Sequence, residues 1–412
     1  MPHILIWILS LASIGLMLVR PWGIAEWLWI SGGALLLVAA RLVTASAAAH
    51  SVAESADVCM FLVGMMLLSE LAREEGIFDW VADLAVRHAQ GSAARLFLWV
   101  FGVGVAITAF LSNDATAVVL TPAVLAVTRR ARVKALPHLM ACALVANAAS
   151  FLLPISNPAN LVVFGAHLPP LGQWLRFFLL PSLASLAATF LCLRLLFRRP
   201  LAGNAAQTGP PGRLPAAGWL ALCGIGLSAA VLLVCSGFGL SLGAPTLATA
   251  LATMGLVALR DRAAPRNALP RISWSILPLV AGLFVIVEAL NRAGLMRLVR
   301  AGVTLLAADR NLWGRAGAAF SAALASNAMN NLPVGLAAGS ALRQMGHTGL
   351  LAHAALLGVD LGPNLSVTGS LATILWLMAL RREGEEVSAW TFLRVGIVAM
   401  PVALLLAVLA LR

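Results

Sequence analysis

The sequence predicts an all-α polytopic membrane protein, and three observations support this fold class. Of the 412 residues, 61% are hydrophobic and only 11% are charged, whereas soluble domains have roughly 25% charged residues. Apolar segments long enough to cross a bilayer follow one another along almost the whole chain. Polar, helix-breaking residues interrupt some of the longer apolar stretches, and they do so in matched sets in the two halves. The matched sets predict two inverted-topology repeats with re-entrant hairpins and broken transmembrane helices.

The apolar segments divide into uninterrupted and interrupted ones. The uninterrupted segments are 4–19, 24–43, 56–71, 175–197, 216–235, 239–259, 273–290 and 390–411. The interrupted stretches are 95–128, 137–166, 313–342 and 349–380, and each is too long for one straight span. Together they predict about ten crossings and two hairpins. Two amphipathic stretches, 73–94 and 291–312, are expected to lie along the membrane surface.

Similar spacing in the two halves predicts the division of the chain. Glu70 and Glu288 stand at corresponding places before a glycine, and Asn113 is paired with Asn327 because each follows a serine at a break. We therefore predict an extra N-terminal helix at 1–23, a first inverted repeat at 24–197, a cytoplasmic loop and linking helix at 198–238, and a second inverted repeat at 239–412. The loop 198–215 is rich in glycine, proline and arginine, and it is expected to be flexible.

The distribution of charge predicts the orientation. The net charge of +12 comes from basic residues, nearly all arginine, that lie between apolar segments, so we interpret them as topology determinants and expect no nucleic-acid partner. The loops 129–134 and 260–271 are rich in arginine, while their counterparts near 343–348 and 44–55 have one arginine and none. Placing the basic loops inside predicts a multi-pass membrane protein with both termini outside. Arginines between 292 and 310 fall on the outer side and go against this trend.

Several kinds of active site are missing from the sequence. No phosphate-binding GxxxxGK[ST] loop, no HExxH zinc motif and no GxSxG nucleophile motif is present. The histidines have no metal-ligand spacing, and the five cysteines lie singly in apolar segments. We therefore predict no catalytic residue, no metal site and no cofactor, and a chain that does not hydrolyse ATP by itself.

The breaks carry the residues that could bind a small polar molecule. Half-helices that meet inside a membrane leave N–H and C=O groups unpaired, and asparagine adds both a donor and an acceptor. A duplicated set of such breaks is typical of the substrate site of a secondary transporter. The candidate binding residues are Asn113, Thr116, Asn157, Asn160, Asn327, Asn330, Asn331, Asn364, Thr368 and Ser370. The alternatives are helix capping and packing between helices by small polar residues.

Each half also contributes one carboxylate to this set. Asp114 lies in the first break of the first half, and Asp360 lies beside the last break of the second half. A charged side chain near the bilayer centre costs about 2.5–3.5 kcal/mol, so an acid kept there is a natural proton carrier. We predict that Asp114 and Asp360 couple transport to protons, the alternative being structural bonds to loop backbone.

At these residues the sequence resembles the arsenical pump membrane proteins, the arsenite/antimonite efflux permeases of the ion transporter superfamily. The matching pieces are SNDATAVVLTP at 112–122, SNPANL at 156–161, SNAMNNLP at 326–333 and VDLGPNLSVTGSLATILW at 359–376. The resemblance implies export of As(III) or Sb(III) across the bacterial inner membrane in exchange for protons, with a soluble ATPase subunit as a possible partner. Arsenous acid is a neutral trihydroxide near pH 7, which suits a site of amides and hydroxyls. The alternatives are a sodium/proton antiporter of the same superfamily and a non-transporting membrane anchor for a soluble ATPase.

Overall fold

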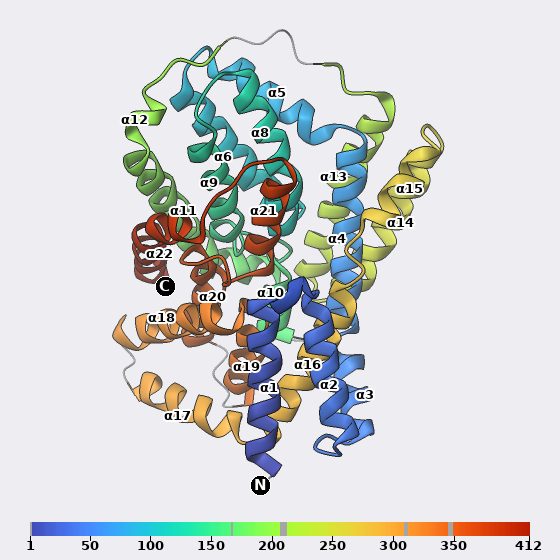
Figure 1. The fold of residues 1–412 in the computed structure, drawn as a ribbon, viewed down its shortest axis with the longest axis vertical. Coiled ribbons are helices and arrows are strands. Elements are labelled where there is room, and N and C mark those ends of the chain that lie inside the picture. The colour runs from blue at the N-terminus through green and yellow to red at the C-terminus, as the bar shows by residue number, and fades with distance from the viewer. Residues whose placement is uncertain (1, 166–167, 207–211, 309–311, 345–348) are drawn as a thin grey trace.

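The chain is almost entirely helical in the computed structural model, which describes residues 2–412 apart from 166–167, 207–211, 309–311 and 345–348 (Figure 1). The helices of the first half are α1 (Pro2–Val19), α2 (Glu26–Ala39), α3 (Ala45–Glu54), α4 (Ala56–Glu74), α5 (Ile77–Ala89), α6 (Ala93–Phe110), α7 (Asn113–Ala115), α8 (Thr121–Arg130), α9 (Ala135–Ala148), α10 (Pro158–Phe164), α11 (Leu171–Leu196) and α12 (Arg198–Leu201). Those of the second half are α13 (Ala216–Gly237), α14 (Gly243–Ala258), α15 (Ala263–Ala268), α16 (Ile276–Arg292), α17 (Leu295–Ala308), α18 (Leu312–Met329), α19 (Asn331–Gln344), α20 (Leu350–Leu361), α21 (Leu371–Arg382) and α22 (Ala389–Ala410).

The helix lengths confirm an all-α polytopic membrane protein. Within the described residues, five helices are long and apolar enough to cross a bilayer, and a sixth span results if α3 and α4, bent by 42° to each other, are taken together. The helices α1, α2, α9 and α14 are apolar but shorter. Every uninterrupted apolar segment of the sequence forms a helix. The number of about ten crossings and two hairpins stays a prediction.

Helices of the two halves pack against each other in matched combinations. The helix α2 packs on α16 as α14 packs on α4, and α1 lies against α2 as α13 lies against α14. The long helices α11 and α22 pack on each other and close this arrangement. Matched contacts of this kind are what two similar halves produce when they wrap around one another. The division at 24–197 and 239–412 remains a prediction.

The polar breaks interrupt the helices where the sequence indicates. At each break a side-chain oxygen accepts a hydrogen bond from a backbone N–H two or three residues further on, which caps the following half-helix. The capping residues are Ser112, Asn157, Asn330 and Ser370. Asn330 adopts the left-handed conformation, with φ of 74°, which asparagine tolerates better than most residues. The capping alternative is therefore correct at these positions.

The backbone at the start of α7 and that at the start of α19 are each bonded to the next break of the same half. The N–H of Asn113 donates to the carbonyl of Ser156 at 3.1 Å, and the N–H of Asn331 donates to the carbonyl of Gly369 at 2.9 Å. Asn113 therefore corresponds to Asn331, and the pairing of Asn113 with Asn327 was wrong. Asn327 still lies inside α18, before the chain turns.

The first part of the loop between the halves is not free, contrary to the expectation of a flexible loop at 198–215. The N–H of Ala205 donates to the carbonyl of Gly91 at 2.8 Å, and the N–H of Ala206 donates to the carbonyl of Ala131 at 2.7 Å. These bonds fix the loop to the turns just before α6 and just after α8. The part at 207–211 lies outside the described residues.

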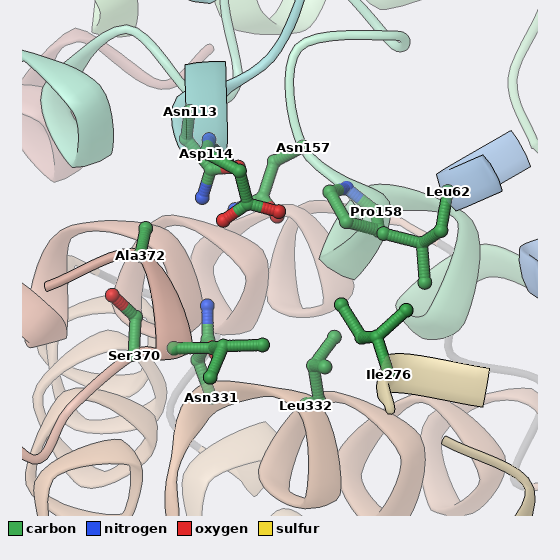
Figure 2. Close-up of a pocket in the computed structure, with 11 residues that line it drawn as sticks. Leu62, Asn113, Asp114, Asn157, Pro158, Ile276, Asn331, Leu332, Ser370 and Ala372 are labelled. Carbon is green, nitrogen blue, oxygen red and sulfur yellow. Dashed lines mark hydrogen bonds between the residues drawn. The ribbon is translucent and has the colours of Figure 1, made fainter. Parts of the chain in front are cut away.

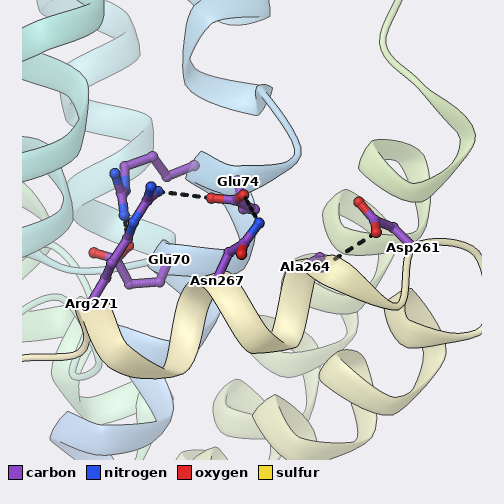
Figure 3. A network of polar contacts seen from close by, with 7 residues as sticks. Glu70, Glu74, Asp261, Ala264, Asn267 and Arg271 are labelled. Atoms are coloured by element: carbon purple, nitrogen blue, oxygen red, sulfur yellow. Dashed lines mark hydrogen bonds and ion pairs between the residues drawn. The ribbon is translucent and has the colours of Figure 1, made fainter.

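Polar side chains fix the segment before α16 to the end of α4 (Figure 3). The carboxylate of Glu74 accepts hydrogen bonds from Asn267 at 2.6 Å and from Arg271 at 2.8 Å. Asp261 caps the start of α15 by accepting from the N–H of Ala264 at 3.3 Å. Because Arg271 is half exposed, this network positions the segment and adds little stability.

Close helix packing gives one testable consequence for stability. A Cβ atom on Gly358 of α20 would lie 2.0 Å from the carbonyl oxygen of Ala319 in α18. The substitution Gly358→Ala is therefore expected to destabilise the protein by about 1–3 kcal/mol, as overpacked sites do. Thermal unfolding of the purified protein in detergent measures this.

The matched control is Gly255→Ala in α14, where nothing lies within 4 Å of the added atom. This substitution is expected to be neutral or to stabilise the protein by up to about 1 kcal/mol. Equal stability of the two variants would contradict the packing of α18 on α20.

Candidate functional site

The half-helices of the two halves meet at one pocket (Figure 2). The empty space among its lining atoms is about 270 Å³, a figure that includes space open to solvent. The lining residues are Leu62, Asn113, Asp114, Asn157, Pro158, Ile276, Asn331, Leu332, Ser370, Leu371 and Ala372. In Figure 2, Asn113, Asp114 and Asn157 lie on one side and face Asn331 and Ser370 on the other.

Helix starts surround this pocket. The helices α7, α10, α19 and α21 all begin at residues that line it. The first backbone N–H groups of a helix lack helical partners and carry partial positive charge. Many of these N–H groups already donate within the breaks, to the capping side chains and to the carbonyls of Ser156 and Gly369. The helix starts therefore give the pocket partial positive charge without any basic side chain.

The lining is polar but carries little charge. Asp114 is the one ionisable side chain among the described lining residues, which include no arginine, lysine, histidine or cysteine. Asn113, Asn157, Asn331 and Ser370 supply the amides and the hydroxyl. Within the described ranges, no three His, Cys, Asp or Glu side chains lie close enough together to hold a metal ion.

Asp114 projects into the pocket from the first turn after the break. Its own N–H donates to Oδ1 of Asn113 at 3.0 Å, which fixes the backbone at this turn. No ion pair within the described part of the chain involves its carboxylate. The carboxylate is therefore free to receive a proton or to accept a hydrogen bond from a ligand.

Asp360 lies behind the pocket and contacts it through one lining residue. It is fully buried, and its Oδ1 accepts a hydrogen bond from Nδ2 of Asn157 at 2.9 Å. Its other oxygen, Oδ2, has no hydrogen-bond partner in the described structure. The two predicted acids thus take different places: Asp114 lines the pocket, whereas Asp360 orients a residue that lines it.

The contact between Asn157 and Asp360 has a counterpart in the other half. Ser370 donates to Oδ1 of Asn147 at 3.5 Å. Asn147 stands as far before Asn157 in the first half as Asp360 stands before Ser370 in the second. Asn147 is therefore the counterpart of Asp360. Asn147 also donates to Oδ1 of Asn364 at 3.0 Å. Asp360 of the second half thus binds the break of the first half at Asn157, and Asn147 of the first half binds the break of the second half at Ser370. Asn147 was missed because it lies in an unbroken helix, and only an alignment of the two halves would have found it.

Two of the predicted residues of the first half do not line the pocket. The hydroxyl of Thr116 bonds to that of Thr108 at 2.8 Å, inside the first hairpin. The amide of Asn160 donates to three carbonyls of the break between α9 and α10, those of Ser150 (2.9 Å), Leu153 (3.3 Å) and Pro154 (3.2 Å). Both residues are buried, and the Asn160 contacts give partners to carbonyls of irregular backbone that would otherwise be costly inside a membrane.

The second half shows the same division between lining and supporting residues. Asn327 donates to the carbonyl of Gly362 at 2.8 Å and accepts from Ser366 at 2.6 Å, while Thr368 donates to the carbonyl of Asn327 at 3.0 Å. Asn364 is buried and donates to the carbonyl of Leu144 at 3.0 Å. These residues keep the second half's breaks together and do not reach the pocket.

The apolar part of the lining could not be found from the sequence. Leu62 of α4 and Ile276 at the start of α16 are apolar residues in apolar segments, so nothing in the pattern distinguishes them. Leu332 follows Asn331 as Asp114 follows Asn113, so the acid of the first half has an apolar counterpart in the second.

Comparison with known proteins places the chain among transporters. Residues 6–379 match the model of the family described as "Citrate transporter". The chain is 31% identical over 376 residues to the arsenical pump membrane protein of Yersinia enterocolitica, with 85% of each protein covered. It is also 31% identical over 377 residues to the protein of that name from Escherichia coli strain K12, again with 85% of each covered. The 46 kDa membrane protein of Mycobacterium leprae is 24% identical over 379 residues.

The fold also has a counterpart among solved structures. The YdaH transporter of Alcanivorax borkumensis, whose crystal structure is described as having an unusual topology, superposes with a TM-score of 0.60. The match covers 100% of this chain and 97% of that one at 17% sequence identity. This likeness supports the fold alone. The sequence resemblance is confirmed by the family model and by relatives that match along most of their length, and the chain therefore belongs to the family of non-enzymatic, multi-pass membrane transporters that includes the arsenical pump membrane proteins.

Proposed function

We propose that this protein exports trivalent arsenic, and antimony in the same form, across the bacterial inner membrane in exchange for protons. The observation that carries the proposal is the pocket between the two halves, which combines one carboxylate with amides, a hydroxyl and helix starts. The two relatives that are 31% identical over 85% of the chain are named as arsenical pump membrane proteins, which supports the same substrate class.

The substrate matches the lining in its chemistry. As(OH)3 and Sb(OH)3 are neutral near pH 7 and present three hydroxyl groups that both donate and accept hydrogen bonds. We assign the contacts with these hydroxyls to Asn113, Asn157, Asn331 and Ser370. The lining contains no cysteine, and thiolates would hold As(III) too tightly for a pump that must release it. Thr116, Asn160, Asn327, Asn364 and Thr368 then act by holding the breaks in shape.

Proton exchange takes place at Asp114 in this proposal. The ionised carboxylate accepts a hydrogen bond from a substrate hydroxyl, and protonation removes its negative charge, which weakens this bond and favours release. One proton then enters the cell as one neutral trihydroxide leaves it. Asp360 contributes through Asn157, because its protonation changes the hydrogen bond that orients that amide.

The same lining argues against the substrate that gives the family model its name. A tricarboxylate would need basic side chains, and the described lining offers one carboxylate instead. A sodium ion is the second candidate, since the oxygens of Asp114 and the neighbouring amides are hard ligands. A membrane anchor for a soluble ATPase would require no such pocket, although an ATPase partner remains compatible with transport.

Purified protein in proteoliposomes tests the proposal. With a pH gradient imposed, acidic inside, we expect uptake of As(III) and Sb(III) into the proteoliposomes, and we expect it to stop when a protonophore removes the gradient. Sodium and citrate are the matched alternative substrates under the same gradient. Sodium-driven proton movement without As(III) uptake would favour the antiporter, and absence of any flux would favour the anchor.

A further inference from the structure

A second chamber adjoins the central pocket on the side of α1 and α2. The empty space among its lining atoms is about 300 Å³, a figure that includes space open to solvent. Its lining residues are Met17, Glu26, Leu279, Leu283, Asn330, Leu332, Leu371 and Ile374. Leu332 and Leu371 line both the chamber and the central pocket. The two spaces are therefore neighbours along one path, with these two leucines at the boundary.

The path continues along one face of α21. Leu371, Ile374 and Met378 are three and four residues apart, which places them on the same side of the helix, and all three are half buried. Leu371 faces the pocket, Ile374 faces the chamber, and Met378 lies one turn further on. The chamber thus leads from the pocket toward the end of α21 that carries Arg381 and Arg382.

An ion pair stands at the far end of this path. The Nη1 atom of Arg20 lies 3.0 Å from Oε1 of Glu26 and 3.3 Å from the sulfur of Met378. Both charged side chains are partly exposed, at 26% for Arg20 and 15% for Glu26. Arg20 joins the corner between α1 and α2 to α21, and it does so from the left-handed conformation, with φ of 50°, that residues other than glycine rarely adopt.

We propose that this chamber is the cytoplasmic entrance to the pocket and that the pair of Arg20 with Glu26 is its gate. The inference rests on the proposed function for the direction of transport, since an exporter loads its substrate from the cytoplasm. Two arginines end α21 on that side, as the positive-inside tendency requires. Glu26 and Asn330 provide polar atoms for a neutral trihydroxide, while the remaining lining is apolar and excludes hydrated ions.

Cysteine labelling tests the path without any need for transport. Ile374→Cys places a thiol in the chamber, and Leu375→Cys places one on the next residue of α21, which lines neither space. A membrane-impermeant maleimide is applied to the cytoplasmic face in inside-out vesicles, with the parent chain and its five cysteines as background. Because maleimides react with the thiolate that water supports, Ile374→Cys is expected to react at least about tenfold faster than Leu375→Cys. Equal rates would overturn the path.

The gate is tested in the same labelling experiment. Adding Glu26→Gln to Ile374→Cys breaks the ion pair and is expected to raise the labelling rate about two- to fivefold, the range of a partly exposed pair. The double exchange Arg20→Glu with Glu26→Arg restores a pair of opposite charges and is expected to return the rate toward that of Ile374→Cys alone. An unchanged rate in Glu26→Gln would overturn the gate.

Transport supplies an independent measurement. Ile374→Trp fills the chamber and is expected to lower As(III) uptake at least about tenfold, corresponding to 1.4 kcal/mol, while Leu375→Trp retains it. Full uptake by Ile374→Trp would overturn the entrance. If the parent protein moves no As(III) but Ile374→Cys is still labelled selectively, the proposed substrate fails and the path stands.

Discussion

Asp114→Asn is expected to lower proton-driven As(III) transport strongly while leaving the protein folded. The amide has almost the shape of the carboxylate but neither binds a proton nor carries charge, so the substrate hydroxyl loses a charged acceptor. Hydrogen bonds to charged groups contribute about 1.5–3 kcal/mol, so we expect uptake in proteoliposomes to fall about 10- to 100-fold. Initial rates under a fixed pH gradient measure this, and the unfolding temperature in detergent checks the fold.

A second acid outside the pocket provides the control for this experiment. Asp83 pairs with Arg130 at 2.6 Å and does not line the pocket. Asp83→Asn removes the same charge from the protein, and we expect its transport to equal that of the parent. Retention of proton-driven uptake by Asp114→Asn would mean that another group exchanges the proton.

Asp360→Ala is expected to lower both stability and transport, since it removes the acceptor for the amide of Asn157. A buried polar group left without a partner costs about 1–3 kcal/mol, and Asn157 then loses its fixed position in the pocket. The thermal unfolding transition measures the first effect and As(III) uptake the second. An Ala variant as stable as the parent would contradict the contact across the two halves.

Asp360→Asn separates the two roles of this residue. The side chain keeps an oxygen that can accept from Asn157, so the unfolding temperature is expected to stay close to that of the parent. Its uptake is expected to lie between those of the parent and Asp114→Asn, because only the contribution of the buried acid is lost. Uptake equal to that of the parent would show that Asp360 acts through shape alone.

The positions of the breaks could be predicted from the sequence because polar residues inside lipid-length apolar stretches are costly anywhere except in an enclosed cavity. Asn113, Asp114, Asn157, Asn331 and Ser370 were found in this way, and the structure brings them to one pocket. The uninterrupted segments were equally clear, since length and hydrophobicity alone define a span.

The direction in which each polar side chain points could not be predicted. Asn160 and Thr116 stand at the same breaks as the lining residues but turn toward their own backbone or a neighbouring hydroxyl. Asn147 gave no signal because a single asparagine inside a helix breaks nothing. Asn327 was matched to Asn113 because both follow a serine, whereas the backbone bonds show that the turn comes four residues later.

The two acids occupy unequal places in the two halves, and this has a consequence for the direction of exchange. Leu332 stands where Asp114 would be repeated, and Asn147 stands where Asp360 would be. In a transporter whose two halves exchange conformations between the inward- and outward-facing states, Leu332 and Asn147 cannot form the proton site that Asp114 and Asp360 form. We therefore expect the inward- and outward-facing states to take up protons at different rates. The rate of exchange should then depend on direction, being faster when protons and substrate are supplied from one face of the membrane than from the other.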